Sequence, residues 1–209
     1  MKIAVVCANG KAGRLIVKEA VSRGHEVTAF ARSANQTVSQ DFRQKDLFDL
    51  TAADLQGFDA VVDAFGAWQE QDLHLHSDSL KHLCKVLSGS DTRLYVVGGA
   101  GSLFVNKEHS AQVSDSPDFP AMFLPLARAQ GKSLEELRAV TDVNWIFVSP
   151  ACDFRADGAR SGKYVLAGEE LSVNDKGESI ISYADYAIGM VDLIEQGGHN
   201  KERVSLRGA

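Results

Sequence analysis

The stretch IAVVCANGKAGRLIVKEAVSR, from Ile3 to Arg23, decides how this chain begins to fold. Ile3–Cys7 is a short apolar run, as in a buried strand. From Lys11 to Arg23 the apolar residues recur close to helical spacing, and Gly24 then provides a stop. The stretch therefore predicts a strand, a glycine-containing turn and a helix in immediate succession.

The turn Cys7-Ala8-Asn9-Gly10-Lys11-Ala12-Gly13 has the features of an anion site. A helix N-terminus presents unpaired backbone N–H groups and the positive end of the helix dipole, and phosphates bind there when the chain can approach closely. Gly10 removes a Cβ from that approach, Gly13 lets the helix pack tightly, and Lys11 adds positive charge. We therefore expect the turn to hold the diphosphate of a dinucleotide. The alternative is an ordinary strand-to-helix turn without a ligand.

Short apolar runs alternate with helix-like segments along the rest of the chain. That alternation predicts an α/β fold with a doubly wound, mostly parallel (Rossmann) sheet. Strands are expected at His25–Ala31, Phe42–Lys45, Phe58–Phe65, Arg93–Val97, Trp145–Ser149 and Arg203–Leu206, with short strands within Tyr164–Val173; helices are expected at Asp72–Leu87, Ala121–Val140 and Asp185–Gln196, and a loop at Leu103–Phe119. Residues 1–209 are expected to form a single domain, with a small C-terminal extension on the substrate side, mainly within 151–182.

Composition narrows the class of protein. The net charge of −6 argues against a nucleic-acid partner, and no stretch approaches the roughly 20 apolar residues that span a bilayer. The apolar run at the start is too short for a signal peptide. The cysteines, Cys7, Cys84 and Cys152, are too scattered for a disulfide framework or a zinc site. We expect a cytoplasmic protein with no membrane partner; the pattern does not indicate an oligomeric state.

The end of the second expected strand bears on which dinucleotide is bound. It continues as Ala31-Arg32-Ser33, without the Asp or Glu that accepts hydrogen bonds from the ribose in an NAD site. Arg32 can instead form charge-assisted hydrogen bonds with a 2′-phosphate, with Ser33 as a further donor. NADP(H) is therefore favoured over NAD(H), and the alternative is that Arg32 is a solvated surface residue.

Five short motifs are spread over nearly the whole chain: Cys7–Gly13, Asp63–Gly66, Val96–Gly101, Trp145–Ala151 and Ile181–Ala187. Together they resemble the atypical short-chain dehydrogenase/reductases of the NmrA-like, NADH-flavin reductase-like group. The resemblance implies contacts of Asn9, Gly10, Lys11 and Ala12 with the diphosphate, of Arg32 with the adenosine ribose or its phosphate, of Asp46 and Leu47 with the adenine, of Ala64, Phe65 and Gly66 with the cofactor ribose, of Gly98 and Gly99 near the nicotinamide, and of Pro150, Ala151, Cys152 and Phe154 with the nicotinamide and substrate pocket.

Cys7 departs from the family pattern, because it stands where the family has the first glycine of the turn. A cysteine does not easily adopt a positive φ. We therefore expect the turn to use a backbone conformation that is ordinary for L-residues, or else to bind the cofactor less well.

A second departure concerns catalysis. Typical reductases of this superfamily carry Tyr-x-x-x-Lys, whose tyrosine protonates the substrate carbonyl, but no tyrosine occurs between Tyr95 and Tyr164. Arg128-x-x-x-Lys132 keeps the spacing without the acid. A flavin or quinone needs less help, because it delocalises the charge that it receives. We expect an NADPH-dependent reductase of a small conjugated acceptor, of the flavin or quinone type, with no catalytic residue assigned. A non-catalytic NADP(H)-sensing regulator is the alternative, and a nucleotide-sugar isomerase or epimerase is disfavoured.

Three further groups admit both a functional and a structural interpretation. His74, Asp78 and His82 share one helical face, but nothing completes a metal site there, and a solvated face is favoured. Cys152 is interpreted as a packing residue rather than a reactive thiol. Ser182 with Asp185 is interpreted as a helix cap with an acid in the first turn.

Overall fold

The computed structural model describes residues 1–209 and contains an eight-stranded sheet in the order β3-β2-β1-β4-β5-β6-β10-β8. The strands, in that order, are β3 (Asp41–Gln44), β2 (Glu26–Ala31), β1 (Lys2–Val6), β4 (Ala60–Asp63), β5 (Arg93–Val97), β6 (Asn144–Pro150), β10 (Glu202–Gly208) and β8 (Tyr164–Ala167). Neighbouring strands are parallel except β10 and β8, which are antiparallel. Two shorter strands, β7 (Asp153–Arg155) and β9 (Ile180–Ser182), form a separate parallel pair. The expected doubly wound, mostly parallel sheet is confirmed.

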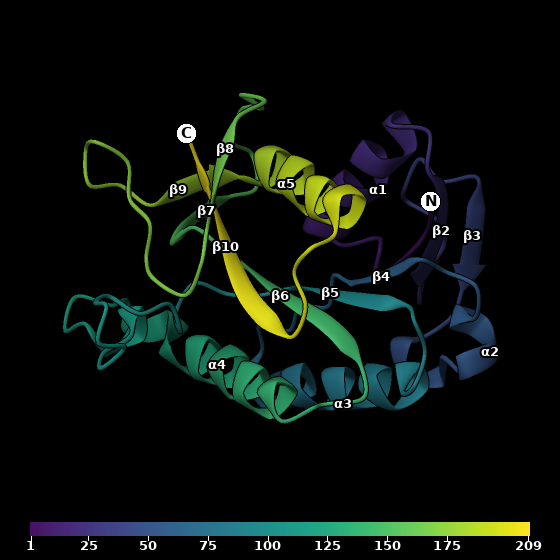
Figure 1. Cartoon of the computed structure of the whole chain (residues 1–209), viewed down its shortest axis with the longest axis horizontal. Coiled ribbons are helices and arrows are strands. Elements are labelled where there is room, and N and C mark those ends of the chain that lie inside the picture. The colour runs from purple at the N-terminus through teal and green to yellow at the C-terminus, as the bar shows by residue number, and fades with distance from the viewer.

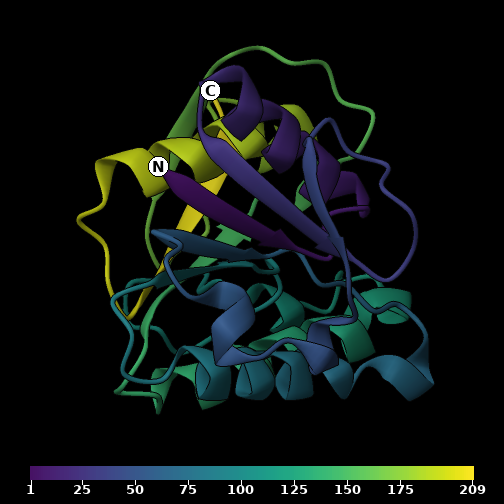
Figure 2. The same cartoon turned by 90° about the vertical axis from the view of Figure 1, so that its right-hand side faces the viewer.

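Helices cover both faces of this sheet (Figure 1). On one face lie α1 (Lys11–Ser22) and α5 (Tyr183–Gln196); on the other lie α2 (Ala52–Leu55), α3 (Leu75–Leu87) and α4 (Leu124–Arg138). Figure 2 shows β1 and β2 passing between the two helical layers. Ile3 and Val5 of β1 belong to the core under α1 and α5, whereas Ala4 and Val6 belong to the core under α3 and α4. The apolar run at the start of the chain is therefore that of a strand buried on both faces.

The direction in which the sheet grows changes at β1, which pairs with β2 on one side and with β4 on the other. The carboxyl ends of the parallel strands lie along one edge, and ligands of open α/β sheets bind at that edge beside such a switch point. The fold therefore brings the turn after β1 close to the segments that follow β2, β4, β5 and β6.

The remaining expected helices and strands are confirmed with shifted boundaries. The strand expected at Phe58–Phe65 is limited to β4, and only β8 forms within Tyr164–Val173. The helix expected at Asp72–Leu87 starts later, as α3, after the 3₁₀ turn η2 (Glu70–Asp72). Short elements were missed: β7, β9, α2, and η1 (Leu47–Asp49) have at most four residues, too few to show a period.

The helix expected at Ala121–Val140 opens with the 3₁₀ turn η4 (Ala121–Phe123) and continues as α4, with Pro125 in its first turn. The preceding segment, Leu103–Phe119, is irregular as expected, apart from η3 (Val113–Asp115). No helix of the protein combines the length and the apolar character that a membrane crossing requires. The description of residues 1–209 as one domain, with 151–182 on the substrate side, stays a prediction.

Candidate functional site

Cys7 adopts a φ of 58°, so the expectation of an ordinary backbone conformation there is wrong, and the alternative, weaker binding of the cofactor, stays a prediction. This conformation costs a non-glycine residue about 1–3 kcal/mol. It persists only where contacts with the rest of the protein enforce it. Here the next amide, of Ala8, donates to the carbonyl of Phe30 at 3.0 Å, and the amide of Gly10 donates to the carbonyl of Cys7 at 3.1 Å. These two hydrogen bonds hold the chain in the tight turn between β1 and α1.

Gly10 is the N-cap of α1 and has φ −66° and ψ 162°, with no side-chain hydrogen bond capping the helix. The first amides of α1 therefore have no intrahelical acceptor, as at any helix start. A Cβ at Gly10 would have nothing closer than the Cys7 carbonyl oxygen, at 3.4 Å, so the glycine leaves room for a ligand rather than for the protein itself. This start of α1 fits the diphosphate of a dinucleotide.

Gly13 has a packing role, as expected. A Cβ there would lie 2.9 Å from both the Cα and the carbonyl oxygen of Ala8, which are backbone atoms that a side-chain rotation cannot move. The glycine lets α1 sit directly on the turn that precedes it.

Asn9 joins the turn to the segment that follows β2. Its amide nitrogen donates to the Ser33 hydroxyl at 3.0 Å and to the Ala34 carbonyl at 2.8 Å, and its amide oxygen accepts from the backbone of Gln36 at 3.0 Å. The side chain that was expected to touch the diphosphate is thus engaged in holding the loop that carries Arg32 and Ser33.

Arg32 lies at the end of β2 with 84% of its side chain exposed, and its Nε is 3.6 Å from Oδ2 of Asp46. Asp46 in turn caps η1, because its carboxylate accepts a hydrogen bond from the amide of Phe48 at 2.9 Å. Leu47 is buried in the core under α3 rather than displayed at the surface. Of Arg32, Asp46 and Leu47, the guanidinium of Arg32 is therefore the exposed group. It faces solvent at the edge of the sheet where the dinucleotide is expected to bind.

The end of β4 presents Ala64, Phe65 and Gly66, and the amide of Ala64 donates to the Val6 carbonyl at 3.1 Å. The ring of Phe65 packs edge-on against His76 of α3, with centroids 5.4 Å apart. Further along the same loop, 69% of Trp68 is exposed. This loop thus runs directly beside the turn after β1.

Of the two glycines after β5, Gly98 is required by packing, whereas the flexible end of a glutamine side chain lies next to Gly99. A Cβ at Gly98 would lie 2.1 Å from the ring of Phe147, and one at Gly99 would lie 2.0 Å from Oε1 of Gln130. Sequence reasoning missed Gln130, which lies three residues after the buried Ala127 on α4. Its helical spacing from that apolar residue was the available signal.

The segment after β6 carries the remaining expected residues. Ala151 is buried, whereas Cys152 is exposed and its amide donates to the Ser179 hydroxyl at 3.2 Å. Pro150 ends β6, and two residues beyond Cys152 the ring of Phe154 packs against Tyr183, with centroids 3.8 Å apart. Although Cys152 is exposed, neighbouring protein atoms exclude part of the water around its thiol and raise the pKa, which reduces the reactive thiolate form.

The spacing Arg128-x-x-x-Lys132 does not build a catalytic pair. The Lys132 side chain is 69% exposed, and its Nζ lies 3.9 Å from Glu136 along the outer face of α4. Ser182 accepts a hydrogen bond from the amide of Asp185 at 3.0 Å, which confirms the helix cap.

The histidine face of α3 has structural contacts. His74 lies 3.8 Å from the carboxylate of Asp78, and His82 donates to the Leu50 carbonyl at 2.9 Å. No group of three or more His, Cys, Asp or Glu residues is arranged to hold a metal ion.

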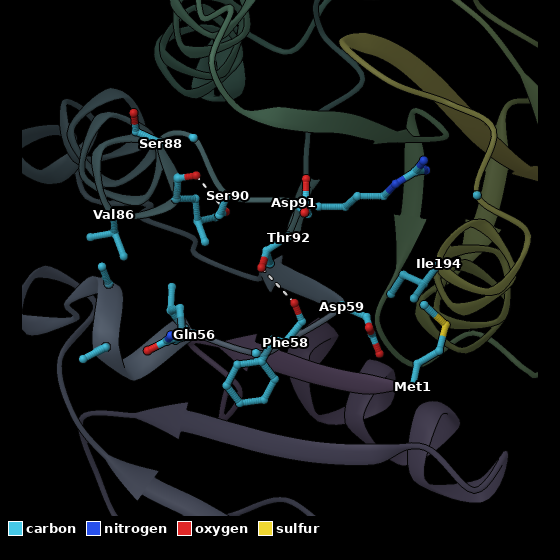
Figure 3. A pocket seen from close by; sticks show the side chains of 18 of the residues that line it. Met1, Gln56, Phe58, Asp59, Val86, Ser88, Ser90, Asp91, Thr92 and Ile194 are labelled. Atoms are coloured by element: carbon cyan, nitrogen blue, oxygen red, sulfur yellow. Dashed lines mark hydrogen bonds between the residues drawn. The ribbon is translucent and has the colours of Figure 1, made fainter.

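A cavity of about 860 Å³ lies at the opposite edge of the sheet (Figure 3). Met1, Asp59 and Arg93, which line it, stand at the amino ends of β1, β4 and β5. Thr92 donates there to the Phe58 carbonyl at 2.8 Å. This cavity is therefore separate from the turn between β1 and α1.

Comparisons with known proteins identify the family. Residues 7–196 match a family described as NAD(P)H-binding. The Bacillus subtilis (strain 168) protein YwnB is 46% identical over 209 residues, which cover 99% of this chain and 98% of that protein. A solved structure from Streptococcus pneumoniae TIGR4, of a candidate NADH-flavin reductase, is 54% identical, covers 100% of both chains and has a TM-score of 0.98.

A candidate epimerase from Bacteroides thetaiotaomicron shows that the fold extends to proteins with another proposed activity. It is 32% identical, covers 99% of this chain and 96% of its own, and has a TM-score of 0.86. Because the family match spans most of the sequence and the likeness to solved structures extends along whole chains, this protein belongs to the NAD(P)H-binding family, among the atypical short-chain dehydrogenase/reductases with a Rossmann fold.

Proposed function

We propose that this protein is an NADPH-dependent reductase that transfers hydride to a small conjugated acceptor of the flavin or quinone type. The observation that carries the preference for NADPH is Arg32, an exposed guanidinium at the end of β2, where an NAD site has an acid. Such a guanidinium suits a phosphate, to which it donates charge-assisted hydrogen bonds.

The cofactor is held, in this proposal, along the carboxyl edge of the sheet. The first amides of α1 bind the diphosphate, Arg32 and Ser33 bind the 2′-phosphate, and Gly98 with Gly99 borders the nicotinamide. When bound, the nicotinamide supplies the hydride. The hydrogen bonds from Asn9 to the loop after β2 keep the two phosphate sites at a constant separation.

The acceptor class follows from what the chain offers beside the nicotinamide. There is no tyrosine between Tyr95 and Tyr164 to protonate a ketone, whereas the paired rings of Phe154 and Tyr183 and the exposed indole of Trp68 offer apolar faces for a planar ring system. The similarity to the candidate NADH-flavin reductase from Streptococcus pneumoniae supports a flavin-type acceptor.

Titration of the protein with NADPH and with NADH, followed by cofactor fluorescence, tests the cofactor preference. We expect Arg32→Glu to weaken NADPH binding about 10- to 100-fold, because a charge-assisted hydrogen bond contributes about 1.5–3 kcal/mol, and to leave NADH binding nearly unchanged. Lys85→Glu, a charge reversal at an exposed position of α3, is the control. Equal affinities for both cofactors, unaffected by Arg32→Glu, would rule out the 2′-phosphate assignment.

Oxidation of NADPH in the presence of a panel of flavins and quinones tests the reaction. Turnover with a flavin or quinone, and not with simple ketones, is the expected result. Tight NADPH binding without turnover of any acceptor would contradict the reductase and favour the regulator that senses NADP(H).

A further inference from the structure

Asp63, the last residue of β4, is a buried carboxyl group without a cation beside it. It is 2% exposed, and Oδ1 accepts one hydrogen bond, from the amide of Phe65 at 3.0 Å. The ionisable groups that face it are the thiols of Cys7 and Cys84 and the imidazole of His76. Burial lowers the pKa of His76, which favours its neutral form. From α4 it is faced by the uncharged Gln130 and Ser133. No neighbouring element therefore supplies a counterion.

A small polar cavity adjoins this carboxyl group. It measures about 10 Å³ and lies between α3, α4 and the ends of β4 and β5. Its polar lining comes from Asp63, His76, Ser79, Gln130 and Ser133. A cavity of that size holds about one water molecule when several polar partners are present, as they are here. Gly98 and Phe65 also line it, so it borders the loop after β4, proposed to contact the cofactor ribose, and the loop after β5, proposed to border the nicotinamide.

The same carboxyl group lies close to the turn proposed to bind the diphosphate. Asp63 pairs in register with Val6, directly before Cys7, and a Cβ at Gly10 would be 3.9 Å from the carbonyl oxygen of the next residue, Ala64. Burial, together with the negative charge of Asp63, raises the pKa of the Cys7 thiol, so the field of the carboxylate reaches the turn. A diphosphate at the start of α1 would place further negative charge near an uncompensated buried carboxylate.

We propose that Asp63 is a proton-binding site coupled to the dinucleotide site: when the diphosphate binds at the turn, the Asp63 carboxylate takes up a proton from solvent. The proton adds to a carboxylate oxygen that faces the small cavity, and the neutral acid can then donate a hydrogen bond there. Uptake removes the repulsion between the carboxylate and the diphosphate, so the cofactor binds more tightly at low pH than at high pH. The inference rests on the proposed position of the cofactor.

The number of protons taken up depends on how far Asp63 is protonated before the cofactor binds. Burial raises the pKa of this carboxyl group to about 6. The hydrogen bond from the amide of Phe65 acts in the opposite direction but is the smaller effect. If the bound diphosphate raises it by about one further unit, the protonated fraction at pH 7 rises by about 0.4. Calorimetric titration with NADPH in buffers of different ionisation enthalpy measures this uptake directly.

The critical comparison is between the unmodified protein and Asp63→Asn. The 2′-phosphate of NADPH has its own pKa of about 6. Its contribution to the proton uptake is the same in both proteins and cancels in the difference. We expect the unmodified protein to take up about 0.4 more proton per NADPH than Asp63→Asn, and Asp78→Asn, an exposed carboxyl on α3, to match the unmodified protein. Equal uptake in all three would overturn the proposal, whereas the absence of any NADPH binding would instead refute the proposed cofactor site.

A second measurement needs no variant. NADH has no titrating phosphate monoester, so the pH dependence of its affinity reports on the protein alone. We expect the affinity of the unmodified protein for NADH to fall about tenfold between pH 5 and pH 8. A flat profile over that range would count against proton uptake at Asp63, even if Asp63→Asn failed to fold.

Discussion

Asp63→Asn should make the folded protein more stable at neutral pH than the unmodified chain. In the unfolded chain the carboxyl group is in water and has an ordinary pKa, whereas in the folded protein burial raises that pKa from 3.8 to about 6. The difference of about two units corresponds to about 3 kcal/mol, since each pKa unit is about 1.36 kcal/mol. The raised folded-state value means that the unmodified protein is most stable below the unfolded pKa and loses this stability as the pH rises from about 4 through about 6.

An asparagine in this place carries no charge at any of these pH values, and its side-chain oxygen can still accept the amide hydrogen of Phe65. The free energy of unfolding, from urea denaturation at a series of pH values between 4 and 8, is the measurement. We expect the stability of Asp63→Asn relative to the unmodified protein to increase by about 2.4 kcal/mol between pH 4 and pH 7. Asp78→Asn should show no such change. A difference between Asp63→Asn and the unmodified protein that is constant with pH would refute the reasoning.

Three substitutions, the first with a matched control, test the packing of a glycine, a helix cap and a buried ion pair, each by urea denaturation. Gly13→Ala should destabilise the protein by about 1–3 kcal/mol, because its Cβ would lie 2.9 Å from backbone atoms, whereas Gly168→Ala, with open space around it, should change stability by less than about 0.5 kcal/mol; equal effects would contradict the packing role. Ser182→Ala removes the N-cap of α5 and should cost about 1 kcal/mol, with an unchanged stability counting against the cap. Arg203→Met should cost about 3 kcal/mol, because the buried guanidinium pairs with Glu169; a variant as stable as the parent would show that the pair contributes nothing.

The agreement between sequence and structure is best where a local pattern is long. The apolar run before Cys7 and the helical spacing after Gly10 are local properties, and they predict β1, α1 and the free amides at the start of α1 without any tertiary information. Arg32 could likewise be placed directly after β2, because the residue that follows a parallel strand lies at a known edge of the sheet.

Other features of the site depend on residues that are distant in sequence. Cys7 takes a positive φ because the amide that follows it is held by Phe30, from another strand. The glycines after β5 are fitted against Phe147 and Gln130, which come from β6 and α4. No period within a short segment reports such contacts, so the packing role of Gly98 and the position of Gln130 beside Gly99 were visible only once the fold was known.

The sequence by itself determined the alternating strands and helices, the glycine turn and the charged residue beside it, because hydrophobic period and backbone preference act over a few residues. Only the tertiary structure decided that Asp63 is buried without a counterion next to that turn. Burial is a property of everything packed around a group, and the environment of Asp63 is built by β1, α3 and α4, of which β1 ends at Val6 and α4 begins only at Leu124.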